Sequence, residues 1–394
     1  MKYIDRKDTN CIKWDGLENQ FGEDGLLSMW VADMDFACPD CVTEALRKYI
    51  EAPLGYFKPP ASYFEAVVQW ERVHHGYEIK PEWICVTPGV VPAIYWAVRV
   101  FTGPGDGVMV STPVYYPFMN AVDHCEQRKL VRCGLKKTGT SYEMDYEKME
   151  EDIVRENVKL YILCNPHNPV GRVWTEEELR RLLELCRKYH VMVISDEIHQ
   201  DIINPMLGDA PTGRKKVTAA TVGDYDDMLI TMAAASKTFN IAAVQNSFVI
   251  IPDEGNREKF QAFQERMSVG NANAFGYIAT EAALRSGETW LREVTEVIFG
   301  NYEYIKRRFE EECPEVKISD LEGTYLMWLD FSFFFAGKRE IEEFLQKKCG
   351  IAMDYGSWFR GEGYDAFVRM NIATSRENVR EACDRMIRAL REEV

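Results

Sequence analysis

A lysine and an aspartate in apolar surroundings are the most chemically suggestive residues of this sequence. Lys237 follows three alanines and Ser236. Burial lowers the pKa of an amine, and a neutral amine can form a Schiff base with a carbonyl compound. Asp196 directly follows the apolar run 191–195, where a carboxylate is partly desolvated and needs a cationic partner. Taken alone, Lys237 also fits a solvated surface lysine. His199 lies close to Asp196, but no third ligand has a recognisable spacing, so we expect no metal site.

Four further segments place polar or aromatic groups after apolar runs. Residues 88–92 form a glycine turn that leads into the helical run 93–101, where backbone N–H groups suit a phosphate. Residues 112–118 hold two tyrosines that can stack on a flat ligand or pack in the core. Residues 165–172 place asparagines and a histidine in a turn between two Asn-Pro steps. Arg369, in a strand-like run, needs an acceptor, which is either a bound carboxylate or a structural ion pair.

Short apolar runs alternate with amphipathic helical stretches and position these residues. The predicted strands are residues 84–87, 108–111, 160–164, 191–195, 228–232 and 247–251. Because these runs are apolar on both faces, we expect an α/β fold with a mainly parallel sheet sandwiched by helices. The clearest helix is 175–189, where Thr175 and Glu178 have the spacing of a capping box. Ligands of such sheets bind at the carboxyl ends of the strands, which is where the residues described above lie.

The chain is expected to divide into a large and a small domain. The large α/β domain is predicted at residues 40–285 and a smaller α+β domain at residues 286–394. The small domain is expected to contain a long helix, 288–312, and a strand, 325–331. We expect the N-terminal segment, residues 1–39, to pack with the small domain.

Composition and charge exclude several classes of protein. The 394 residues are 46% hydrophobic, and 47 basic against 63 acidic residues give a net charge of −16. Such an acidic surface repels phosphate backbones and anionic lipid, so we expect neither nucleic-acid nor membrane binding. The start of the chain is polar, and no apolar window is long enough to span a bilayer. Eleven scattered cysteines favour reduced thiols in a cytoplasmic protein over a disulfide or zinc framework.

The order of these groups along the chain is more specific than any one of them. The chain resembles the aminotransferase class I/II superfamily of pyridoxal phosphate enzymes, fold type I, over nearly its whole length. Within that superfamily, the resemblance is to the cystathionine β-lyase and cysteine C–S lyase subgroup. Five segments carry it: residues 29–36 (MWVADMDF), 88–93 (PGVVPA), 165–175, 195–199 (SDEIH) and 236–242 (SKTFNIA). The fold implied is a large cofactor-binding domain with a seven-stranded sheet, plus a smaller α+β domain.

The resemblance implies a role for each polar candidate. Lys237 is similar to the lysine that joins pyridoxal 5'-phosphate as a Schiff base and later moves the Cα proton. Asp196 is similar to the carboxylate that keeps the pyridine nitrogen protonated. Asn168 is similar to the hydrogen-bond donor to the ring hydroxyl oxygen, and His199 stands near that oxygen, where many relatives have a tyrosine. Arg369 is similar to the residue that binds the substrate α-carboxylate.

The resemblance also implies a stacking residue and a set of phosphate contacts. Tyr115 is similar to the aromatic residue that stacks on the cofactor ring. Tyr115 or Tyr116 is expected to deliver a proton to the leaving group, which requires a phenol with a lowered pKa. The phosphate contacts expected are the backbone N–H groups of Val90 and Val91, the Ser236 hydroxyl, and Tyr56 from the other subunit of a homodimer. Gln245 stands where many aminotransferases have a phosphate-binding arginine, and Ala234 stands where a hydroxyl is common, so neutral donors and the helix dipole are expected to meet the phosphate.

The function implied is β-elimination from L-amino acids that carry sulfur on Cβ, giving a thiol, pyruvate and ammonia. The first alternative is an aminotransferase, which shares the early steps but needs a second keto acid. The other alternative is a protein of this fold that acts mainly as a regulatory binding partner. The partners expected are a small amino-acid substrate and a second copy of the chain, with active sites at the subunit interface.

Overall fold

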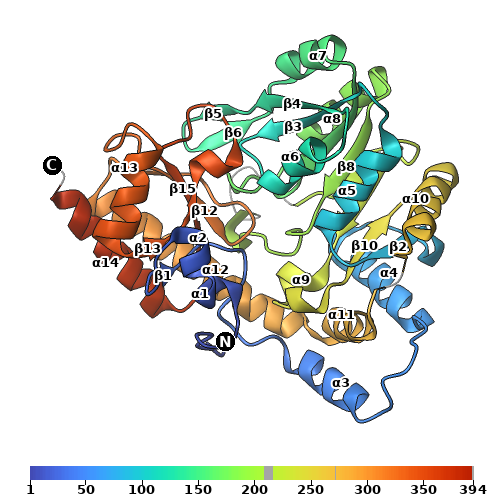
Figure 1. The fold of residues 1–394 in the computed structure, drawn as a ribbon, viewed down its shortest axis with the longest axis horizontal. Coiled ribbons are helices and arrows are strands. Elements are labelled where there is room, and N and C mark those ends of the chain that lie inside the picture. Colours follow the sequence, from blue (N-terminus) through green and yellow to red (C-terminus); the bar gives the residue numbers. More distant parts are fainter. Residues whose placement is uncertain (208–215, 271, 393–394) are drawn as a thin grey trace.

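The computed structural model describes residues 1–207, 216–270 and 272–392. Its main feature is a seven-stranded sheet with the order β2-β10-β9-β8-β7-β3-β4 (Figure 1). The strands are β2 (Ile84–Thr87), β3 (Gly107–Thr112), β4 (Lys129–Gly134), β7 (Val158–Cys164), β8 (Met192–Asp196), β9 (Leu229–Ala233) and β10 (Ser247–Ile250). β10 runs antiparallel to both of its neighbours and the other pairs are parallel. The predicted α/β fold with a mainly parallel seven-stranded sheet is confirmed.

Helices cover both faces of this sheet because alternate strand side chains point to opposite sides. Val110 and Ile162 pack on one face with side chains of α5 (Val90–Phe101), α6 (Tyr116–Asp123) and α10 (Glu254–Met267). Met109 and Tyr161 pack on the other face with α7 (Tyr146–Arg155) and α8 (Glu176–Lys188). The capping box predicted for α8 is confirmed, since the Thr175 hydroxyl accepts from the Glu178 N–H and the Glu178 carboxylate accepts from the Thr175 N–H.

The chain after the large sheet builds a second, antiparallel sheet with the order β11-β12-β15-β14. Its strands are β11 (Lys317–Ile318), β12 (Leu326–Asp330), β14 (Asp354–Tyr355) and β15 (Phe367–Asn371). Its helices are α12 (Glu288–Glu312), α13 (Lys338–Glu343) and α14 (Arg376–Arg391), with a π-helical turn at Phe344–Cys349 and a 3-10 turn at Gly356–Phe359. The long helix predicted at 288–312 is therefore confirmed.

The N-terminal chain lies against this second sheet before it enters the large one (Figure 1). It contains α1 (Ile12–Asp15), α2 (Leu17–Phe21) and β1 (Leu27–Ser28), and β1 pairs in parallel with β13 (Ile351–Ala352). The helices α3 (Asp40–Ile50), α4 (Ala61–His75) and α11 (Ala274–Ser286) pack together at the lower edge of the view in Figure 1. The remaining elements are a hairpin of β5 (Lys136–Thr138) and β6 (Ser141–Glu143), the short helix α9 (Ala235–Thr238), and single 3-10 turns at Pro81–Trp83, Pro205–Leu207, Ala219–Thr221 and Ala242–Val244. No helix in the described part of the chain is long and apolar enough to cross a membrane.

Candidate active site

A cavity of about 200 Å³ lies at the carboxyl ends of the central strands. Most of its walls come from turns that follow strands, so the site largely follows from the sheet topology. The turns after β2, β3, β7, β8 and β9 supply Val90, Tyr115, Asn168, His199 and Lys237. The other lining residues are Ala32, Pro88, Gly89, Val91, Pro92, Cys164, Asp196, Ile198, Ser236, Ala242, Gln245 and Asn246. The structure therefore brings eight of the eleven site residues that the sequence predicts to the lining of one cavity.

Lys237 lies on α9, the short helix that begins immediately after β9. Its Nζ donates a hydrogen bond to the Ala32 carbonyl oxygen over 2.6 Å. Desolvation lowers the pKa of the amine, and the positive charge of Arg369 adds to this effect. The carboxylates of Asp33 and Asp196 act in the opposite direction. A lowered pKa favours the neutral amine, which is the nucleophilic form.

Asp196 is the last residue of β8 and is only 4% exposed. Its Oδ1 accepts a hydrogen bond from the Ile198 N–H over 3.0 Å. Burial raises its pKa to about 7, and the charge of Glu197 adds to this. The charge of Lys237 acts to lower this pKa, but among the residues that the structure describes none forms an ion pair with Asp196, so the buried carboxylate lines the cavity without a cation in contact with it.

His199 is a neutral donor and acceptor at the same wall. Burial, with the charges of Lys237 and Arg369, lowers its pKa to about 3. The Nδ1 atom is buried and has no hydrogen-bond partner in the described part of the chain. A neutral imidazole with a free nitrogen can therefore bind a polar group of a ligand in the cavity.

Arg369 connects the second sheet to the cavity. It lies on β15 opposite Asp354 of β14, and the two side chains form an ion pair that is almost fully buried. The Nη1 atom of Arg369 donates to Oδ1 of Asn168 over 3.0 Å, and its Nε has no partner among the described residues. Of the two interpretations that the sequence left open for Arg369, the structural ion pair is present, and a free donor remains for a bound carboxylate.

The cavity end next to α5 is lined by neutral groups. Val90 and Val91 form the first turn of α5, where backbone N–H groups have no partner within the helix. Ser236, Gln245 and Asn246 complete this end, and the Nδ2 atom of Asn246 has no partner among the described residues. A helix N-terminus with hydroxyl and amide donors suits a phosphate group.

Three predicted residues are not among those that line the cavity: Arg369, described above, Tyr116 and Tyr56. Tyr116 lines a separate, shallower depression together with Gln20, Asn120 and Trp358. Tyr56 is fully exposed and does not reach the cavity of its own chain. Burial also raises the pKa of both Tyr115 and Tyr116, so the expectation of a phenol with a lowered pKa is wrong for this structure.

The turn at residues 165–172 contributes one side chain only. The Asn165 amide donates to the Val217 carbonyl, and the His167 ring is bonded to the Pro113 carbonyl, so both fix the loop. Gly171 has a φ of +77°, and a Cβ there would lie 2.9 Å from the Leu321 side chain, so the turn needs glycine. Asn168 is thereby left facing the cavity.

Sequence reasoning missed Ala32 and Asp354. Ala32 acts through a backbone carbonyl, which leaves no signal in the residue type. Asp354 is identified only by the strand register that places it opposite Arg369. The MWVADMDF segment that contains Ala32 is one of the five segments on which the family resemblance rests. Its residue types nevertheless did not predict that it takes part in the site.

The residues present fit the cofactor that the resemblance implies. The unpaired, buried carboxylate of Asp196 matches a protonated pyridine nitrogen. The unpartnered Nδ1 of His199 and the donors at the start of α5 match the ring hydroxyl and the phosphate. The Lys237 amine lies in the same cavity as these groups, as a Schiff base with the cofactor aldehyde requires.

Comparisons with known proteins agree with this geometry. The chain is 39% identical to cystathionine β-lyase PatB of Bacillus subtilis (strain 168), over 99% of both chains. It is similar to cystalysin from Treponema denticola, whose structure contains a pyridoxal 5'-phosphate cofactor, with a TM-score of 0.93, 37% identity, and coverage of 100% of this chain and 98% of that one. It is also similar to the PLP-bound C–S lyase from Staphylococcus hominis, with a TM-score of 0.90, 32% identity, and coverage of 99% and 97%. The profile of aminotransferase class I and II matches residues 28–386, and the chain belongs to this family.

Proposed function

We propose that this protein is a pyridoxal 5'-phosphate-dependent carbon–sulfur lyase that acts on L-amino acids with sulfur on Cβ. The observation that carries the proposal is that Lys237, Asp196 and Asn168 line one cavity, and that Arg369 donates a hydrogen bond to Asn168. The similarity over the full chain to cystathionine β-lyase PatB and to the C–S lyase from Staphylococcus hominis supports this reaction over others of the same family. The products are a thiol, pyruvate and ammonia.

The cofactor is held by groups that differ in charge from one end of the cavity to the other. When bound, pyridoxal phosphate supplies an electron sink for negative charge at the substrate Cα. The Asp196 carboxylate binds the ring N–H, and a cation there relieves the cost of burying it. Asn168 and His199 bind the ring hydroxyl oxygen, and Tyr115 stacks on the ring. The N–H groups of Val90 and Val91, with Ser236, bind the phosphate.

Lys237 and Arg369 act on the substrate. The Arg369 guanidinium, already fixed by Asp354 and Asn168, orients the substrate α-carboxylate. The neutral amine of Lys237 removes the proton from the substrate Cα. The thiolate then leaves Cβ as a good leaving group, and the unsaturated amine that remains hydrolyses to pyruvate and ammonia. The protonated side chain of Lys237, which has taken the Cα proton, supplies a proton to the leaving sulfur.

A homodimer completes the phosphate end of the cavity. Exposed apolar side chains gather near the ends of α3, α10 and α11: Ile50, Leu54, Tyr56, Met267 and Phe275. Ring contacts of Tyr49 with Phe57 and with Phe275 bring part of this surface together. An apolar surface of this kind supports association with a second copy. The exposed Tyr56 then reaches the phosphate in the cavity of the partner.

A cytoplasmic location is supported by the thiols. All eleven cysteines are free, as in a reducing compartment. Two of them, Cys38 and Cys41, are three residues apart at the start of α3, a C-x-x-C spacing, yet burial raises the pKa of both thiols. Raised pKa values disfavour the thiolates that disulfide exchange needs. We further propose that residues 1–39, 40–285 and 286–394 act as the N-terminal segment, the large domain and the small domain.

The test is to supply cystathionine to the purified holoenzyme without any keto acid. A lyase releases pyruvate over many turnovers, whereas an aminotransferase stops after one turnover per site. Sustained pyruvate release supports the proposal. A single burst that resumes only when a keto acid is added would contradict it and establish the aminotransferase alternative.

A further inference from the structure

The segment Val31–Phe36, which carries Ala32 into the cavity, belongs to no helix or strand except for one isolated bridge at Phe36. Its carbonyl groups are nevertheless bonded by side chains from distant parts of the chain. Asn371 donates to the carbonyls of Val31 and Asp33 over 2.6 and 2.7 Å. Asn240 donates to those of Met34 and Phe36 over 3.1 and 2.7 Å. A segment held in this way keeps one backbone conformation without a ladder or helix of its own.

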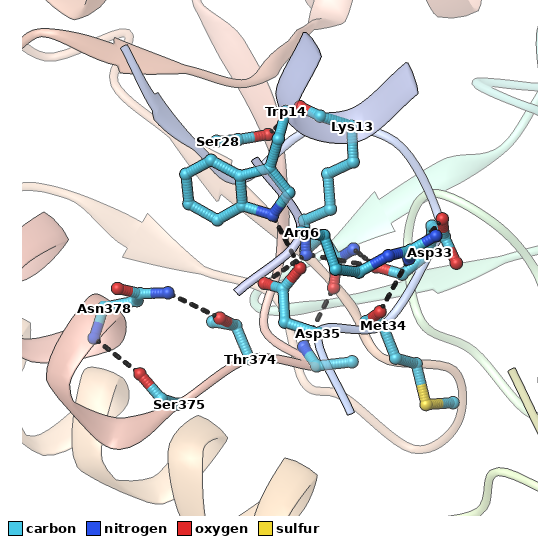
Figure 2. A network of polar contacts seen from close by, with 12 residues as sticks. Arg6, Lys13, Trp14, Ser28, Asp33, Met34, Asp35, Thr374, Ser375 and Asn378 are labelled. Carbon is cyan, nitrogen blue, oxygen red and sulfur yellow. Dashed lines mark hydrogen bonds and ion pairs between the residues drawn. The ribbon is translucent and has the colours of Figure 1, made fainter. Parts of the chain in front are cut away.

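A fully buried ion pair adds a further restraint. Lys13 and Asp35 are both fully buried, and their side chains lie 2.7 Å apart. Trp14 donates its indole N–H to the other oxygen of Asp35 over 2.8 Å, and Lys13 also donates to the Asp33 carbonyl over 3.1 Å. Figure 2 shows Lys13 and Trp14, neighbours on α1, both pointing at the Asp35 carboxylate.

The restrained segment is in direct contact with the Lys237 amine. The Ala32 carbonyl, within the restrained segment, accepts from Nζ of Lys237 and from the hydroxyl of Tyr325. The Asp33 carboxylate, in the same segment, favours the charged form of that amine. A buried ion pair gives little stability beyond that of a packed apolar pair, but its directed hydrogen bonds fix geometry. In this protein, those hydrogen bonds fix the position of the Ala32 carbonyl oxygen.

We propose that Lys13 and Asp35 are positioning residues for Lys237. By fixing the 31–36 segment they hold the Ala32 carbonyl where it receives the Lys237 amine, and so set the direction of that amine toward the substrate Cα. The part of this inference that concerns turnover rests on the proposed lyase function. The part that concerns the amine itself does not, because it is a property of the chain freed of its cofactor.

The test uses the double variant Lys13→Met/Asp35→Asn, which removes both charges and leaves an acceptor for Trp14. In the full chain freed of cofactor, labelling of Lys237 with an amine reagent is measured against pH by peptide mapping. The protonated amine loses its fixed acceptor, so the labelling midpoint shifts to lower pH by about half a unit or more. In the holoenzyme, kcat for pyruvate release falls about tenfold or more, while KM stays within about threefold, because Arg369 is untouched.

Three further variants make the result specific. Trp14→Phe removes only the bond to Asp35 and should give a smaller shift in the same direction, so the test survives if the double variant does not fold. Asp152→Asn removes a buried carboxylate of α7 far from the segment, and should change stability but neither the midpoint nor kcat. The single variant Lys13→Arg keeps the positive charge beside Asp35. It should therefore keep both the labelling midpoint of Lys237 and kcat for pyruvate release close to their wild-type values.

The outcomes separate the two claims. A folded double variant and Trp14→Phe that both keep the wild-type labelling midpoint and the wild-type kcat would overturn the positioning role. A wild-type protein that releases no pyruvate would instead contradict the lyase function, and the labelling experiment would still decide the role of Lys13 and Asp35.

Discussion

Arg369 of β15 donates a hydrogen bond to Oδ1 of Asn168, at the end of β7, over 3.0 Å. The two residues are 201 positions apart, and their contact joins the second sheet to the cavity of the large one. Asp354 holds the other side of the same guanidinium. The group proposed to bind the substrate carboxylate is therefore fixed before substrate arrives, which reduces the entropy lost on binding.

Replacing Arg369 by lysine should weaken substrate binding while retaining the charge. Lysine still neutralises Asp354 but cannot contact Asn168, Asp354 and a carboxylate with one planar fork. We expect KM for cystathionine to rise about 10- to 100-fold, measured by pyruvate release.

Arg172→Lys is the matched control for this variant. Arg172 is also 2% exposed and binds both oxygens of Glu178, whereas Arg369 binds Asn168, which lines the cavity. It should lower thermal stability and leave KM unchanged. An equal rise in KM for both variants would show that Arg369 acts only through the fold.

Replacing Asp196 by asparagine should change activity and stability in opposite directions. The folded chain without cofactor raises the pKa of Asp196 to about 7, from about 4 in the unfolded chain. The raised pKa stabilises the fold fully below about pH 4, and this contribution is lost as pH rises to about 7. Asp196→Asn removes that loss, so at pH 8 the cofactor-free variant should be more stable than wild type by on the order of 3 kcal/mol, and at pH 4 the two should be similar.

The same substitution removes the negative charge that is proposed to pair with the ring nitrogen of the cofactor, so kcat should fall at least about 100-fold. Denaturant unfolding at the two pH values and pyruvate release measure the two effects. If Asp196→Asn is less stable than wild type at pH 8, the Asp196 carboxylate must have a stabilising partner in the cofactor-free protein, which would contradict the structure.

Mixing two inactive variants tests the shared site. Tyr56→Ala and Lys237→Ala chains should each lose most of their activity as homodimers. In a mixed dimer one cavity has Lys237 from one chain and Tyr56 from the other, so unfolding and refolding the two together should restore pyruvate release. Absence of any recovery, with mixed dimers demonstrated by mass, would show that Tyr56 serves its own subunit or none.

The helix cap predicted from sequence offers a test of stability alone. Thr175→Ala removes the hydroxyl that accepts from the Glu178 N–H at the start of α8. It should lower the free energy of unfolding by about 1 kcal/mol and leave pyruvate release unchanged. A loss of activity at unchanged stability would indicate that α8 influences the site in a way that the fold does not show.

Sequence patterns identified six of the seven strands of the large sheet, including the edge strand β2, but not β4 at the other edge. The strands β7, β8 and β9 read as continuous apolar runs because helices cover both of their faces. β4, at the edge, alternates exposed residues such as Lys129 and Arg132 with buried ones, so it forms no such run and was missed. The reversed direction of β10 leaves no mark in composition either.

The site was predictable where chemistry depends on a side chain that follows a strand. Asp196 and Lys237 are polar residues in apolar surroundings, so the sequence alone singles them out. Ala32 and Asp354 depend on where distant segments meet, and no local pattern records that. The lowered phenol pKa was expected from chemistry, yet burial of Tyr115 raises it.

The central claim is that the Lys237 amine carries the cofactor in a cavity whose acid is Asp196. The most direct measurement is reduction of the purified, reconstituted protein with borohydride, followed by peptide mapping of the trapped residue. We predict that a single modified lysine is found, at position 237, and that Lys237→Ala is neither labelled nor active. A label on another lysine, or a Lys237→Ala chain that releases pyruvate at the wild-type rate, would contradict the account.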